Sequence, residues 1–132
     1  MTLHVDLVVP EGEIWAGDAE RVIAKTLDGD IGVLTGHTPV LGILAEGSVV
    51  RILPADGQGG GGEVAAAIGA GFLSVADDRV SVLARRAQLG ADVDRAGVQA
   101  WLDAALEAAG PGEETADVRY FRALLRAAGD RA

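Results

Sequence analysis

The sequence predicts an N-terminal antiparallel β-sandwich of about ten strands followed by a C-terminal antiparallel two-helix hairpin. Before residue 90, apolar residues alternate with polar ones or gather in short runs, which is typical of strands. Gly, Asp and Pro residues separate these runs at short intervals, as expected for antiparallel sheets. After that point alanine is dense, and apolar residues recur every three or four positions, as in amphipathic helices. We therefore expect a sandwich domain at 1–89 and a helical domain at 90–132.

The expected strands begin with residues 3–9, where apolar side chains alternate strictly with His4 and Asp6. No long helical pattern interrupts the strand region, which argues against a βαβ nucleotide-binding fold. Later runs with the character of strands lie at 49–53, 64–68, 72–75 and 80–83. Residues typical of turns lie at 10–12, 28–29, 46–47, 57–62 and 77–78.

The glycine-rich stretch at 57–62 formally fits a G-x-G-x-x-G phosphate-binding motif. No helix start follows it, and Glu63 would repel a pyrophosphate. We interpret this stretch as the tip of a hairpin. The chain contains no G-x-x-x-x-G-K-[ST] sequence, so a P-loop nucleotidase is excluded at the level of its motif.

Residues 27–42 combine several glycines and Pro39 with Ile, Val and Leu at short spacing. Glycine permits positive φ or close backbone approach, and proline restricts φ and removes a donor. We therefore expect a sharply turning loop that packs on apolar residues and exposes Asp30 and His37. Such a loop suits a docking surface better than a catalytic pocket.

The two expected helices follow residue 90. Asp92 or Asp94 is placed to cap the first helix, and the glycines around Pro111 should end it. The second helix should begin near Thr115. Because an alanine-rich hairpin buries little apolar area, we expect its docking on the sandwich to be only marginally stable. The apolar faces comprise Val98, Trp101, Leu102, Ala105 and Ala109 in the first helix, and Val118, Phe121, Leu125 and Ala128 in the second.

The loop at 27–42 resembles the β-turn region of the epsilon subunit of F-type ATP synthases, in which acidic residues and glycines alternate before a Pro-Gly-His-x-Pro-Leu sequence. Thr35 stands where that family usually has a proline, and Val40 precedes Leu41. The resemblance continues in the opening strand, in the Gly-Ala-Gly-Phe-Leu-Ser-Val run within 69–82, and in residues 92–96.

This resemblance implies a noncatalytic rotor subunit of a proton-translocating ATP synthase. It implies contact with the gamma subunit and the membrane-embedded c-subunit ring, and transient contact with the catalytic head. The polar tip of the loop is the expected ring contact, since it can hydrogen-bond to polar loops of the ring. The expected ring-contact residues are Asp28, Gly29 and Asp30, and the expected gamma-contact residues are His37, Pro39 and Leu41.

Composition limits the other partners. The chain has 132 residues, with 11 basic and 20 acidic side chains, and a formal net charge of −9. This charge repels nucleic-acid phosphates and anionic lipids, so we expect no nucleic acid and no direct bilayer insertion. No apolar run reaches the roughly 18 to 20 residues of a membrane span, and the start lacks signal-peptide character. We therefore expect a peripheral protein, held by its complex at the cytoplasmic face of the bacterial plasma membrane.

Three arginines, Arg119, Arg122 and Arg126, form a basic stripe on the second helix of an otherwise acidic chain. One interpretation is an ordinary solvated face that pairs with Asp103 and Glu107 across the hairpin. The other is a binding stripe for an acidic partner. The family resemblance favours the binding stripe, because it implies that epsilon helices in the extended form face acidic elements of the catalytic head and inhibit ATP hydrolysis.

Some bacterial epsilon subunits bind ATP through an Ile/Leu-Asp-x-x-Arg-Ala motif, which Asp92, Arg95 and Ala96 match here, although Ala91 replaces the large aliphatic residue. Arg122 and Arg126 are the expected phosphate contacts, since guanidinium groups suit phosphate geometry. Capping by Asp92 beside an exposed Arg95 is the alternative, and we favour it. We expect no resident cofactor, with ATP as a candidate regulatory ligand.

Enzyme chemistry has no support in the sequence. The chain lacks cysteine, and its two histidines are too far apart to form a recognisable metal-ligand spacing. Two rival functions remain. A ligand-binding β-sandwich with a helical lid would need a roomy apolar cavity, which a 4% aromatic content disfavours. A small enzyme that uses scattered carboxylates would need a strongly perturbed acid in a cleft. Both rivals predict a self-sufficient monomer.

Overall fold

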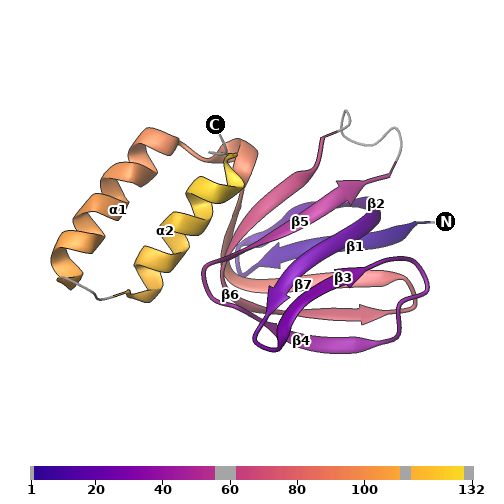
Figure 1. Ribbon diagram of the computed structural model, residues 1–132. Helices are drawn as coiled ribbons and strands as arrows, with labels where there is room; N and C mark the ends of the chain where they lie inside the picture. Colours follow the sequence, from indigo (N-terminus) through magenta and orange to yellow (C-terminus); the bar gives the residue numbers. More distant parts are fainter. Residues whose placement is uncertain (1, 56–61, 111–113, 130–132) are drawn as a thin grey trace.

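The structure is a computed structural model that describes residues 2–55, 62–110 and 114–129. A β-sandwich carries a two-helix hairpin at one end, as Figure 1 shows. The predicted fold class is therefore confirmed. The described strands are β1 (Leu3–Val9), β2 (Gly12–Thr26), β3 (Gly29–Val33), β4 (Val40–Leu44), β5 (Ser48–Pro54), β6 (Val64–Ala76) and β7 (Arg79–Leu89). A 3₁₀ turn, η1 (Gly90–Asp92), and the helices α1 (Arg95–Ala109) and α2 (Ala116–Ala127) follow them.

The described part of the chain contains seven strands, fewer than the approximately ten predicted from the apolar runs of the sequence. The runs at 64–68 and 72–75 belong to the single strand β6, whose register against β7 shifts between Ile68 and Gly71. A bulge bends a strand without ending it. A Cβ atom on Gly71 would collide with the backbone of Leu83, so glycine allows β6 and β7 to approach closely at this bend.

Two long strands join the layers of the sandwich. The first half of β2 pairs with β1, and its second half pairs with β5 and β3. In the same way, β6 pairs with β5 near its start and with β4 near its end. One pairing departs from the antiparallel prediction: β1 and β7 lie parallel. These strands are far apart in the sequence, so no tight turn imposes an antiparallel direction on them.

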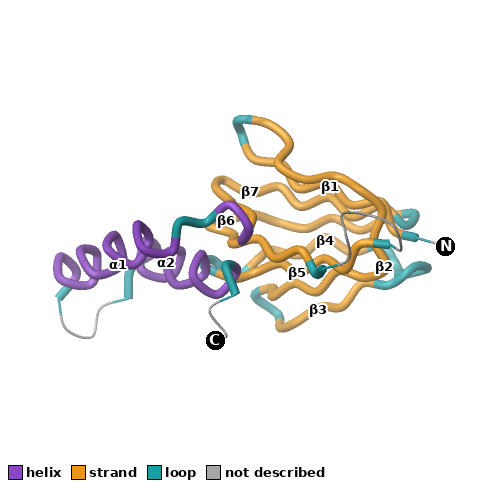
Figure 2. Tube along the Cα trace, turned by 90° about the horizontal axis from the view of Figure 1, so that it is seen from above, coloured by secondary structure: helices purple, strands orange, loops and turns teal. Residues whose placement is uncertain are grey.

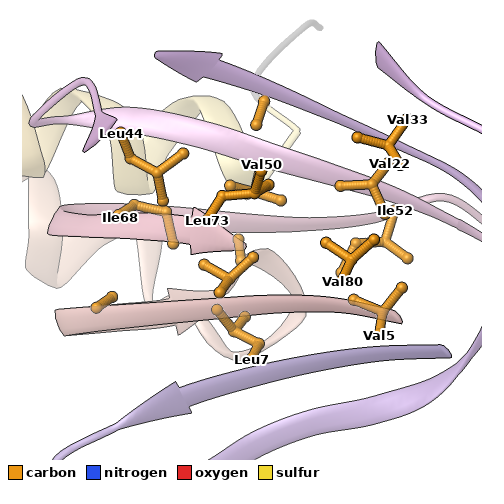
Figure 3. Packing of buried hydrophobic residues seen from close by; sticks show 14 of the residues in the cluster. Val5, Leu7, Val22, Val33, Leu44, Val50, Ile52, Ile68, Leu73 and Val80 are labelled. Carbon is orange, nitrogen blue, oxygen red and sulfur yellow. The ribbon is translucent and has the colours of Figure 1, made fainter. Parts of the chain in front are cut away.

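The core lies between the layers and is built from the inward residues of the alternating strands (Figure 3). In β1, the predicted apolar positions are all buried, and Leu3, Val5 and Leu7 have no exposed surface. The same alternation in β5 buries Val50 and Ile52. Period-two patterning therefore accounts for the sandwich interior.

Replacing the fully buried Leu73 by Ala should lower the free energy of unfolding by about 2 to 5 kcal/mol, because it removes apolar contacts and leaves a cavity. The matched control is Leu41→Ala on β4, where the side chain is 71% exposed and a change within about 0.5 kcal/mol is expected. Urea denaturation followed by circular dichroism measures both. A loss under about 1 kcal/mol for Leu73→Ala would contradict this packing.

The hairpin packs on the sandwich through α2, which contacts β5 and β6, while α1 packs on α2 (Figure 2). Asp94 caps α1, since its carboxylate accepts from the Gly97 N–H at 3.3 Å, and Thr115 caps α2. Gly110 ends α1 as predicted. The expected hairpin tip within 57–62 lies, apart from Gly62, outside the described residues, as does Pro111.

The apolar surface of α2 is wider than predicted, because the helix is covered on two sides. Val118 and Leu125 are buried as expected, and so are Tyr120, Ala123 and Leu124. These residues share one cluster with Val98 and Leu102 of α1 and with Ala65 and Ala67 of β6. In contrast, Trp101 of α1 is 59% exposed, and its ring centroid lies 5.9 Å from that of Phe121.

Candidate functional site

The expected ring-contact residues form the tight turn between β2 and β3. Gly29 has φ +121°, which favours glycine at this position. The Thr26 hydroxyl donates to the Gly29 carbonyl at 2.7 Å and accepts from the Asp28 N–H at 3.1 Å. Asp28 and Asp30 are exposed beside this braced backbone. The turn is therefore short and held by internal hydrogen bonds, and it exposes the Asp28 and Asp30 carboxylates beside Leu27, whose side chain is 68% exposed.

The expected gamma-contact residues lie on the connection from β3 to β4 and at the start of β4. Gly36 has φ +82°, and its N–H donates to the Asp78 carboxylate at 2.6 Å. This bond fastens the connection to the β6–β7 turn. His37 Nδ1 donates to the Thr38 carbonyl at 2.7 Å, and Pro39 and Leu41 are exposed. No local pattern in the sequence indicates the bond to Asp78, because its partners are 42 residues apart.

An exposed apolar row crosses three neighbouring strands, and we call Ile43, Phe72 and Leu83 the apolar face. The sheet register places Phe72 of β6 opposite both Ile43 of β4 and Leu83 of β7. Their exposed fractions are 62%, 43% and 39%, respectively. Leu41 points to the same side of β4, two residues before Ile43. An apolar hollow of about 560 Å³ adjoins the face and is also lined by Val8 and Pro10.

The apolar face was not predicted from the sequence, although the residues carry a signal for it. In β6 and β7, apolar residues occupy adjacent positions, as in Phe72-Leu73 and Val82-Leu83. A strand with one solvated face should carry polar residues at every second position. The adjacent pairs therefore indicate that the outer face of these strands is apolar. An exposed apolar patch of this kind is typical of a protein interaction surface.

The arginine stripe faces the β4–β5 turn. Arg119 donates to the Glu46 carboxylate at 2.8 Å and to the Glu114 carbonyl at 2.8 Å. Arg126 donates to the Gly47 carbonyl at 2.8 Å, and Arg122 pairs with the Glu114 carboxylate at 2.7 Å. The stripe therefore bonds to the sandwich and to the residue that precedes the Thr115 cap of α2.

The suggested pairing of the stripe with Asp103 and Glu107 across the hairpin is wrong. In the described part of the chain neither residue forms an ion pair with these arginines, and Asp103 accepts instead from Gln99 at 3.0 Å. The reason is the rotation of α2, which turns its apolar side toward α1 and its arginines toward the β4–β5 turn.

The four candidate ATP-binding residues do not share one groove in this arrangement. Arg122 and Arg126 line a groove of about 340 Å³, together with Lys25 and Ser48. Neither Asp92 nor Arg95 lines this groove. Asp92 lies in η1, and Arg95 is the exposed first residue of α1. Asp94 rather than Asp92 provides the cap of α1.

A second polar tie between sandwich and hairpin involves Arg86 of β7. Its guanidinium lies 4.1 Å from the centroid of the Tyr120 ring and pairs with Asp117 at 2.8 Å. Burial raises the pKa of the Tyr120 hydroxyl, and the Arg86 charge opposes that rise. A Cβ atom on Gly69 would collide with the Arg86 side chain, so this glycine leaves room for the arginine.

Among the residues that the structure describes, no group of three or more His, Asp or Glu side chains is arranged to hold a metal ion. Within those same residues, neither helix is both long and apolar enough to cross a bilayer.

Comparisons with known proteins agree with this architecture. The family described as "ATP synthase, Delta/Epsilon chain, beta-sandwich domain" matches residues 2–90. The ATP synthase epsilon chain of Thermobifida fusca is 50% identical over 128 residues, which are 96% of this chain and 91% of that protein. The epsilon chain of Streptomyces coelicolor is 43% identical over 130 residues, which are 98% of this chain and 97% of that protein.

Solved structures share the fold at low identity. A chain of the Euglena gracilis mitochondrial ATP synthase aligns with a TM-score of 0.67 at 21% identity, covering 94% of this chain and 75% of that one. A chain of the Tetrahymena thermophila central stalk and c-ring gives a TM-score of 0.61 at 18% identity, with 92% and 95% covered. The family match over the sandwich, and the identity over nearly the whole chain, show that this chain belongs to the ATP synthase delta/epsilon chain family.

Proposed function

We propose that this chain is the epsilon-type central-stalk subunit of a bacterial, proton-translocating F-type ATP synthase, and that its sandwich couples the gamma subunit to the membrane ring. Members of its family are subunits of the synthase with structural and regulatory roles and are not enzymes by themselves. The observation that carries the coupling proposal is the apolar face on β4, β6 and β7. The complex holds the chain peripherally at the cytoplasmic face of the plasma membrane.

The apolar face supplies the central part of the gamma contact in this proposal. Its three side chains expose a continuous apolar surface whose removal from water favours association. Leu41 extends this surface toward Pro39 and His37 on the connection before β4. The sequence-based gamma contacts thus become one edge of a larger surface, with apolar residues at its centre and His37 at its polar margin.

The β2–β3 turn is the proposed contact with the c-subunit ring. Asp28 and Asp30 present carboxylates to hydrogen-bond donors on polar ring loops, and the Thr26 hydroxyl braces the backbone between them. A rotor contact must transmit torque without yielding. A short turn with internal hydrogen bonds is suited to this task, because its backbone groups are already paired before the ring is bound.

The hairpin is the proposed regulatory part. Arg119, Arg122 and Arg126 would bind an acidic surface of the catalytic head and thereby inhibit ATP hydrolysis, since guanidinium groups form strong paired contacts with carboxylates. ATP remains a candidate regulatory ligand. All four candidate residues can hold one nucleotide only if the hairpin is arranged differently. In the docked hairpin, Arg122 and Arg126 line a groove that Asp92 and Arg95 do not line.

Binding to gamma tests the proposed function. Purified chain and purified gamma subunit should form a complex of equal stoichiometry at micromolar concentration, measured by isothermal titration calorimetry and gel filtration. Because the proposed contact is mainly apolar, the affinity should persist at about 0.5 M salt, where interactions between exposed charges are largely screened. Absence of a complex at micromolar concentration would remove the proposal in favour of a self-sufficient ligand-binding sandwich.

A further inference from the structure

We propose that the hollow beside the apolar face receives a large apolar side chain of the gamma subunit, and that Arg85 at its rim pairs with a gamma carboxylate. This inference rests on the gamma contact proposed for the apolar face. It adds the chemistry of the gamma segment that fits there, which is an acidic residue close to an apolar anchor. Arg85 is then a residue that determines specificity for the partner.

The hollow lies where strand pairing changes on both sides of the β6–β7 pair. The pairing of β4 with β6 ends at Gly71, and the pairing of β1 with β7 ends at Leu83. Next to these points, the small residues Ala70 and Ala84 line the hollow. Phe72 and Leu83 line it as well, so one continuous apolar surface runs from the apolar face into the hollow.

The size and the lining of the hollow fit an apolar anchor. Its volume of about 560 Å³ lies within the range of about 300 to 1,000 Å³ that is typical of binding pockets. Arg85 is the only lining residue with a charged side chain among those that the structure describes, and the others are apolar or glycine. A side chain that enters such a hollow removes apolar surface of both partners from water, which favours association.

A β-bulge places Arg85 at the hollow. In β7, Ala84 and Arg86 pair with consecutive residues of β6, so Arg85 between them is an extra residue without a partner in the register. Bulges of this kind change the direction of a side chain. Arg86 contacts Tyr120 and Asp117 of α2, whereas Arg85 lines the hollow. The bulge thus gives two adjacent arginines different partners.

The charge of Arg85 is available to a partner. Its side chain is exposed and forms no ion pair with any residue in the described part of the chain. A guanidinium beside an apolar contact loses water when the partner binds, and a carboxylate opposite it offsets that cost. Because the chain has a net charge of −9, it repels carboxylates in general. Arg85 therefore favours the one docking register that brings a gamma carboxylate to the hollow.

Replacing Arg85 by Gln in the full-length chain should weaken binding to purified gamma about tenfold at about 0.05 M salt, as measured by titration calorimetry. At about 0.5 M salt the loss should shrink to about threefold, because salt screens the charge pair. The midpoint of thermal unfolding should not change, since the side chain is exposed. A purely structural role of Arg85 predicts instead a lower midpoint and a loss of affinity that salt does not alter.

The gamma carboxylate is identified by double-mutant cycles. Each Asp and Glu of gamma is replaced by Asn or Gln and titrated against the unaltered chain and against Arg85→Gln. One gamma substitution should weaken binding to the unaltered chain about tenfold and binding to Arg85→Gln no more than about twofold. If no gamma carboxylate shows such coupling, the pairing is overturned.

Replacing Ala70 by Leu tests the anchor, because it fills part of the hollow without adding charge. It should weaken gamma binding about tenfold, since the anchor is excluded by the added side chain. The matched control is Ala16→Leu at an exposed position of β2 that does not line the hollow, and it should change the affinity by no more than about twofold. Unchanged or tighter binding by Ala70→Leu would overturn the anchor.

The control for charge is Arg21→Gln on β2, which removes an exposed arginine that forms no ion pair within the described residues. It should leave gamma affinity within about twofold. If gamma binds and the apolar face proves necessary, but Arg85→Gln and Arg21→Gln bind equally well, the role of Arg85 is wrong and the proposed function stands. If the unaltered chain does not bind gamma at all, the proposed function fails and this inference fails with it.

Discussion

Replacing Phe72 by Asp should weaken binding of the chain to the gamma subunit by about 100-fold or more. Phe72 lies in the middle of the apolar face, between Ile43 and Leu83 in the sheet register. A carboxylate at this position must be desolvated when gamma covers it, and the aromatic contact is lost as well. Titration calorimetry with purified gamma measures the change in the dissociation constant.

The control for this substitution is Ile23→Asp on β2. Ile23 is 37% exposed, close to the 43% of Phe72, and it alternates with Val22 and Ala24 of the core, so it points away from the sandwich interior on another strand. Its substitution should leave gamma affinity within about threefold. Thermal unfolding of both variants checks that the fold survives. Equal losses of affinity in the two variants would mean that the apolar face is not the gamma contact.

Deleting residues 90–132 should leave the chain able to assemble and should raise ATP hydrolysis by the synthase about fivefold. The sandwich core contains no residue of the hairpin, so the remaining domain keeps its buried interior. The surface newly exposed on β5 and β6 consists of small residues, chiefly Ala65, Ala67 and Val49. Hydrolysis is measured in assembled complexes whose subunit content has been verified by electrophoresis.

A second experiment separates the effect of the arginine charges on hydrolysis from the effect of the hairpin as a whole. Replacing Arg119, Arg122 and Arg126 together by Gln should raise hydrolysis nearly as much as the deletion, since the paired contacts to carboxylates are lost. Asp103→Asn on α1 alters a charge of the same hairpin outside the stripe and should leave hydrolysis unchanged. If the deletion activates hydrolysis and the arginine replacement does not, then the hairpin inhibits through another surface.

The sequence alone predicted the elements whose cause is local. Strict alternation located β1 and its buried positions, because side chains of a strand point alternately to opposite faces. Thr115 was placed correctly as the start of the second helix, because a capping hydroxyl acts within three residues. The Asp-Gly turn at 28–29 followed from the same short-range logic, since only glycine readily adopts its backbone angle.

The fold class, the start of the second helix and the tight turns could therefore be predicted from the residues alone, and so could the family that the loop resembles. The first cap, which falls on Asp94 and not on Asp92, was left open. The parallel pairing of β1 with β7, the alignment of Ile43, Phe72 and Leu83 into one face, and the partners of the arginine stripe became visible in the folded chain alone. Periodicity and capping act within a few residues, and these features do not. The register of distant strands and the rotation of α2 depend instead on how the whole chain packs.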